Sequence, residues 1–65
     1  DEEELLQERL YELESEHKDL DDVIDRLART PPIDFLQMQR LKKRKLQLKD
    51  DIQRIKSRLL PDIIA

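Results

Sequence analysis

The sequence predicts an all-α fold, an antiparallel two-helix coiled-coil hairpin. The first reason is composition, because 45% of the residues are charged and only 3% are aromatic, which is typical of long amphipathic helices. The second is an apolar residue at alternating intervals of three and four along both halves of the chain, the spacing of a coiled-coil seam. The third is a single interior break at Pro31 and Pro32, which leaves two long helices joined by one turn.

We expect one helical hairpin that spans the whole chain, since 65 residues form a single small domain at most. Its parts are helix one at about 2–28, a turn at 29–34, helix two at about 35–60 and a tail at 61–65. A proline disfavours helical geometry at the residue before it, so helix two starts after the prolines, with Asp34 as N-cap, and ends by Leu60. A start capped by Thr30 is the alternative. Because the chain begins at Asp1 without a methionine, we also expect a few residues to precede it.

The apolar seam predicts which residues face each other. Its positions on helix one are Leu6, Leu10, Leu13, His17, Leu20, Ile24 and Leu27. On helix two they are Met38, Leu41, Lys45, Leu48, Ile52, Ile55 and Leu59. Paired in antiparallel order, the residue numbers of every facing pair sum to 65, which places the hinge at Pro32 and Ile33. An intramolecular hairpin and a domain-swapped dimer with extended helices both satisfy these sums.

Two polar residues occupy adjacent layers of this seam. His17 faces Leu48, Lys45 faces Leu20, and Asp21 lies one helical turn from His17. A polar seam residue lowers stability but fixes register. We therefore interpret His17, Lys45 and Asp21 as a register-setting polar layer, because a hairpin slipped by one heptad would bury Lys45 without a carboxylate in reach.

The charges divide between the two halves of the chain. Residues 1–30 carry twelve acids and four bases, whereas residues 31–65 carry nine bases and four acids, so the halves should attract each other. On one flank of the seam, the register predicts two interhelix ion pairs: Asp21 with Lys42 and Glu14 with Lys49. On the other flank Glu16 faces Asp51, which is also an acid. Opposite charges meet there only along diagonals such as that from Glu16 to Arg44. That flank is one place where another chain could dock.

Some apolar residues lie outside the seam and form a candidate partner surface. They are Tyr11, Leu36, Leu46, Leu60, Ile63 and Ile64. Scattered exposed apolar residues are common, and a chain end such as the tail often frays. The alternative is a second apolar face that two hairpins bury as a four-helix bundle. Since a core of this size rarely supplies more than about 3 to 5 kcal/mol, we expect a homo-oligomer, a dimer, and a further protein partner.

Composition and motif content argue against catalysis. The chain has no Gly and no Cys, which excludes glycine-rich phosphate loops, disulfides, thiolate zinc sites and cysteine nucleophiles. His17 is the only histidine, and with Glu14 it forms a Glu-x-x-His motif, half of the helix motif of di-iron bundles. Helix two offers too few acids to complete such a site, so we expect no enzyme, no metal and no cofactor. No apolar run approaches the ~18 residues of a membrane span, and we expect a cytoplasmic protein.

Nucleic-acid binding is the alternative function, because the densest basic stretch lies in helix two. Its candidate contacts are Arg40, Lys43 and Arg44. Helical geometry spreads these side chains around the helix, and no aromatic residues interleave with them for base stacking. Lys42 and Lys49 are assigned to the ion pairs with helix one. Nucleic acid is therefore a less favoured partner than protein.

Two segments carry a family resemblance. The first is Glu16-His17-Lys18-Asp19-Leu20-Asp21 followed by Ile24, and the second is Leu41-Lys42-Lys43-Arg44-Lys45-Leu46-Gln47-Leu48-Lys49-Asp50-Asp51-Ile52. The chain resembles the YdcH-like family of small bacterial proteins, a domain of unknown function, over roughly Leu6 to Ile55. The resemblance implies a short helical hairpin in the bacterial cytoplasm and brings no substrate or catalytic residue. The resulting interpretation is a non-catalytic protein-interaction or structural module.

Overall fold

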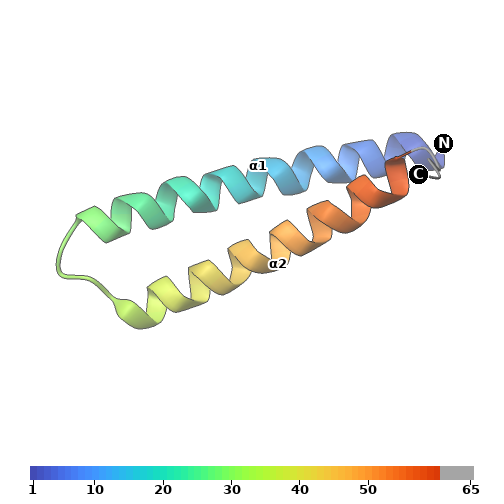
Figure 1. Cartoon of the computed structure of the whole chain (residues 1–65). Coiled ribbons are helices and arrows are strands. Elements are labelled where there is room, and N and C mark those ends of the chain that lie inside the picture. Colours follow the sequence, from blue (N-terminus) through green and yellow to red (C-terminus); the bar gives the residue numbers. More distant parts are fainter. Residues whose placement is uncertain (61–65) are drawn as a thin grey trace.

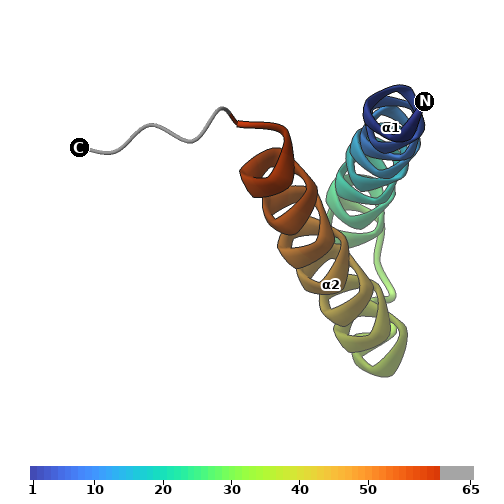
Figure 2. The ribbon, with the colours of Figure 1, turned by 90° about the vertical axis from the view of Figure 1, so that its right-hand side faces the viewer.

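The structure is a computed structural model that describes residues 1–60. Helix α1 spans Glu2–Arg29 and helix α2 spans Phe35–Leu59, and the two run antiparallel from one turn (Figure 1). The all-α helical hairpin predicted from the sequence is therefore confirmed. A view along the hairpin shows that the two helices are inclined to one another rather than parallel (Figure 2).

Side chains cap the start of both helices. The backbone N–H of Glu4 donates to Asp1 Oδ1 at 2.8 Å, and that of Gln37 donates to Asp34 Oδ1 at 3.0 Å. Each bond satisfies one of the amide groups that a helix leaves free in its first turn. Asp34 is thus the N-cap of α2, and the alternative start at Thr30 does not occur.

The helix ends follow from the prolines. Thr30 ends α1 with a ψ of 87°, outside the helical range, as expected of a residue that precedes Pro31. Its hydroxyl donates to the carbonyl of Arg26 at 2.9 Å. Leu60 ends α2 with an extended ψ of 137°, because Pro61 follows it. Helix α2 therefore stops at Leu59, one residue before the expected end, and α1 runs one residue further than expected.

The predicted seam is the part of the hairpin that is shielded from solvent. Within residues 1–60, all fourteen seam positions are buried or half-buried, and only Glu16 and Asp51 join them. Both of these acids lie directly beside the seam on one flank. The heptad spacing therefore identified the buried residues, and the remaining described residues are exposed.

The core is narrow and centred on three side chains. Leu13, Leu48 and Ile52 form the buried cluster, with exposed fractions of 2%, 0% and 7%. Leu10, Leu20 and Ile55 pack against it while remaining partly exposed. A core one side chain deep leaves both broad sides of the hairpin open. Neither described helix is long and apolar enough to cross a membrane.

We predict that Leu48→Ala will remove most of the stability of the hairpin, because emptying a buried leucine site costs about 2 to 5 kcal/mol and a core this small supplies little more. The measurement is urea unfolding followed by circular dichroism. Leu5→Ala is the matched control, since Leu5 is 66% exposed and its truncation should change the unfolding free energy by less than about 0.5 kcal/mol. Equal losses from the two variants would contradict the packing described above.

Candidate protein-interaction surface

The hairpin has two broad sides, separated by the seam, and they carry different charges. The heptad positions that flank the seam fall on opposite sides of an antiparallel pair. We call one side the lysine face, defined by Glu14, Asp21, Lys42, Lys49 and Lys56. We call the other the arginine face, defined by Glu2, Glu16, Arg44 and Arg58.

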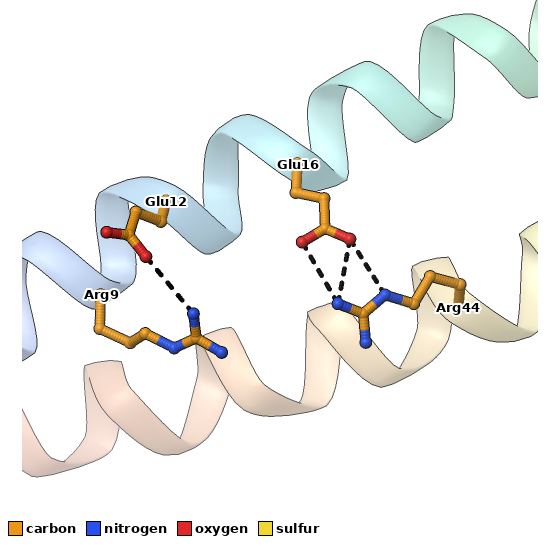
Figure 3. Close-up of polar contacts among 4 residues, drawn as sticks. All are labelled: Arg9, Glu12, Glu16 and Arg44. Carbon is orange, nitrogen blue, oxygen red and sulfur yellow. Dashed lines mark hydrogen bonds and ion pairs between the residues drawn. The ribbon is translucent and has the colours of Figure 1, made fainter.

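On the arginine face, ion pairs join the two helices. Arg44 donates from Nε and Nη2 to the two carboxylate oxygens of Glu16 at 3.0 and 3.2 Å, and the two side chains point directly at each other (Figure 3). Arg58 lies 3.5 Å from Glu2. Because the residue that faces Glu16 is the acid Asp51, the pairing shifts by one heptad along the diagonal to Arg44. The two-pronged geometry is the strong form of an arginine–carboxylate contact.

The other charges directly beside the seam on this side, Arg9 and Asp51, pair along their own helices. Arg9 lies 3.4 Å from Glu12 within α1 (Figure 3), and Arg54 lies 3.6 Å from Asp51 within α2. All charges directly beside the seam on this flank are therefore paired, whereas Asp19, Arg26 and Arg40, further out on this side, make no ion pair within residues 1–60. Beside the seam, this flank leaves fewer unpaired charges for a second chain than the opposite one does.

The lysine face forms different ion pairs from those expected. Lys45 Nζ donates to Asp21 Oδ1 at 2.5 Å, and Lys56 Nζ lies 3.9 Å from Glu14. No ion pair joins Asp21 to Lys42, or Glu14 to Lys49, in the part of the chain that the structure describes.

The direction of the side chains favours this difference on the lysine face but does not set the pairing by itself. A helical Cα–Cβ bond tilts toward the N-terminus of its own helix. In this antiparallel pair, two side chains therefore lean toward each other when their residue numbers sum to more than 65. The expected pairs, Asp21 with Lys42 and Glu14 with Lys49, sum to 63 and lean apart, whereas the observed pairs sum to 66 and 70. The longer arginine side chains of the other face reach against this direction, since both of their interhelix pairs sum to 60.

The change of partners leaves cations on the lysine face without an ion-pair partner. Lys42 and Lys49 make no ion pair with any residue of the described range 1–60 and are exposed, and the same holds for Lys43 on the outer edge of α2. Arg40 shares this property on the outer side of α2. The candidate nucleic-acid contacts are therefore unequal, because Arg40 and Lys43 are free whereas Arg44 is held by Glu16.

The central polar layer brings its three residues together. Lys45 is half-buried in the seam and reaches out to Asp21 at the edge. The hydrogen bond from Lys45, its positive charge and a smaller effect of His17 hold the pKa of Asp21 below its ordinary value of 3.8. His17 is half-buried beside Lys45 and Lys49. The residues that the structure describes contain no cluster of side chains able to hold a metal ion.

Exposed apolar residues gather on the lysine face. Tyr11 and Leu46 lie on its two helices with exposed fractions of 76% and 62%, and Leu60, the extended residue after α2, is 67% exposed. Phe35 belongs to the same face at 74%, and the sequence interpretation missed it because it treated this position only as a flank of the seam. Leu36, at 59%, lies on the outer edge of α2. The other two candidates, Ile63 and Ile64, fall outside the described residues.

A shallow hollow joins these features on the lysine face. It is lined by His17, Ile24, Lys42, Lys45, Leu46 and Lys49. Apolar side chains from both helices meet lysines at its edge, and two of those lysines lack an ion-pair partner. Such a hollow can accept an apolar side chain while its rim pairs with carboxylates on either side.

The comparison with known families covers most of this surface. A family model described as "Protein of unknown function (DUF465)" matches residues 10–56. The chain belongs to this family. The DUF465 segment contains the central polar layer, the buried cluster and the hollow on the lysine face, and the family description names no activity. It does not extend to the narrower YdcH-like name. No curated protein and no solved structure matches the chain.

We predict that Lys45→Met will raise the pKa of Asp21 toward 3.8, because the largest causes of its lowering are the hydrogen bond and charge of Lys45. A carboxyl-carbon NMR titration measures this directly. Since the folded-state pKa lies below the unfolded value, the pair stabilises the hairpin above about pH 3.8 and this contribution is lost as the pH falls through the folded-state pKa. Lys43→Met is the control, and an Asp21 titration that responds equally to both variants would refute the assignment.

Proposed function

We propose that the protein is a non-catalytic interaction module of the bacterial cytoplasm that binds other proteins through its lysine face. The observation that carries the proposal is the exposed Leu46 between two lysines, Lys42 and Lys49, that have no ion-pair partner in residues 1–60. The resemblance to the YdcH-like family supports the bacterial setting. In this proposal the chain catalyses no reaction, since its one histidine serves the polar layer.

The chemistry of the lysine face defines the kind of partner. An amphipathic helix can lie in the groove between two antiparallel helices and place apolar side chains along it. Free lysines at the rim favour a partner whose apolar stripe is bordered by Asp and Glu, because complementary charges select the partner and its orientation. We therefore expect the partner to present an acidic amphipathic helix.

Two leucines of similar exposure on opposite faces give a matched test. Leu46 is 62% exposed on the lysine face, and Leu5 is 66% exposed on the arginine side of α1. We predict that Leu46→Asp will abolish capture of partner proteins from the native lysate, because it puts an acid in the apolar centre of the docking surface. Leu5→Asp should leave capture unchanged. The measurement is quantitative mass spectrometry of nuclease-treated eluates.

The outcomes of this capture experiment separate the alternatives. Circular dichroism of both variants checks that neither substitution unfolds the hairpin. Equal capture by Leu46→Asp and Leu5→Asp would show that proteins do not bind through the lysine face. Recovered material that disappears after nuclease treatment would favour the nucleic-acid function instead.

A small nucleic-acid-associated protein is the second candidate. The observation that favours it is the group of bases on α2 that have no ion-pair partner within residues 1–60: Arg40, Lys42, Lys43 and Lys49. Phosphate contacts of this kind make affinity fall steeply with salt. Under this function, Arg40→Glu with Lys43→Glu would abolish duplex binding and flatten its salt dependence. Binding to DNA or RNA that does not respond to salt or to this variant would exclude it.

A further inference from the structure

We propose that a second copy of this chain covers the lysine face, in a symmetric dimer that places the acidic α1 of each copy against the basic α2 of the other. The inference rests on the proposed function, in which the lysine face is a docking surface. It specifies one partner for that surface and the charges that align it.

The charges left over from pairing within the chain are complementary. In the described range 1–60, Lys42, Lys43 and Lys49 on α2 make no ion pair. Glu3 and Glu8 on α1 likewise make none. Lys18 and Arg26 on α1 and Asp50 on α2 are also without an ion-pair partner in this range, so the unpaired charges are mainly basic on α2 and mainly acidic on α1. A two-fold axis presents the same patch of both copies to each other, so each copy can supply the acids that the other lacks.

The apolar residues of the lysine face follow the same division. Leu46 shares its hollow with Lys42 and Lys49 on α2. Tyr11 shares a second hollow with Glu4 and Glu8 on α1. Both residues belong to one face, so a two-fold axis between them brings the acid-flanked Tyr11 of one copy over the lysine-flanked Leu46 of the other. Apolar contact and charge pairing then occur together, twice in each dimer.

The size of the face is sufficient for a stable dimer. Two helices side by side, each about 10 Å wide and about 40 Å long, present about 800 Å² on one side. That equals the area of about 800 Å² that each partner buries in a standard interface. Within residues 1–60, the buried side chains are Leu13, Met38, Leu48 and Ile52. With so small a core of its own, the chain gains stability from a second layer of helices.

Reciprocal charge reversal tests this dimer on the full chain. One variant carries Lys42→Glu with Lys49→Glu, and the other carries Glu4→Lys with Glu8→Lys. All four positions are exposed, so the substitutions do not disturb the seam. Sedimentation equilibrium should show the unchanged chain at twice its mass of 7.9 kDa. Each variant alone should dimerise about tenfold or more weakly, because like charges then face each other.

An equimolar mixture of the two variants decides the proposal. In the mixed dimer every reversed charge faces an opposite one, so dimerisation should return at low salt and weaken at high salt. If a variant alone loses helicity, recovery of the helical circular dichroism signal on mixing reports the same event. Failure of the mixture to associate would overturn the proposal, as would variants that stay dimeric by themselves.

The unchanged chain separates this inference from the function on which it rests. A chain that stays monomeric up to millimolar concentration would overturn the dimer. If it still captures a protein through Leu46, the docking surface stands and its occupant is a different acidic helix. If capture does not depend on Leu46, both proposals fail.

Discussion

Two helices that pack along one seam can bury only the side chains between them, and this limit governs the rest of the molecule. Leu13, Leu48 and Ile52 are well shielded, while most of their seam neighbours remain half-exposed. A core of this kind holds the helices together without covering either broad side. The side chains beside the seam therefore decide register and orientation, and they also decide which surface is left for another molecule.

The charges beside the seam are paired to different extents on the two faces. On the arginine face, the two-pronged contact of Arg44 with Glu16 joins the helices, and the other charges directly beside the seam have partners nearby. On the lysine face, Asp21 pairs with Lys45 inside the seam, which leaves Lys42 beside Leu46 without a carboxylate. Exposed ion pairs contribute little to stability individually. Their larger effect is on the surface: the charges directly beside the seam are paired on the arginine face, whereas Lys42 and Lys49 on the lysine face have no ion-pair partner within residues 1–60.

Seam, hinge and fold class followed from the sequence because each depends on spacing alone. Residue numbers that sum to 65 fix the level at which two backbones meet, and the buried positions agree with that register. The ion pairs depend on how far long, flexible side chains reach along the helices, which residue spacing does not give, and Asp21 pairs with Lys45 rather than Lys42. The diagonal from Glu16 to Arg44 was foreseeable because its facing residue, Asp51, is also an acid. Phe35 was overlooked because its position beside the seam does not state how much of its side chain the partner helix covers.

The segregation of acids on α1 and bases on α2 also makes the hairpin an electric dipole that lies across its long axis. A molecule of this kind feels an oriented field before it touches anything, and that field turns it so that its basic edge leads toward a negative partner. Encounters are then faster and more often productive than those of a uniformly charged rod of the same shape. Ionic strength shortens the range of this guidance to about 8 Å at physiological salt. The lysines without ion-pair partners thus influence the kinetics of recognition as well as its final contacts.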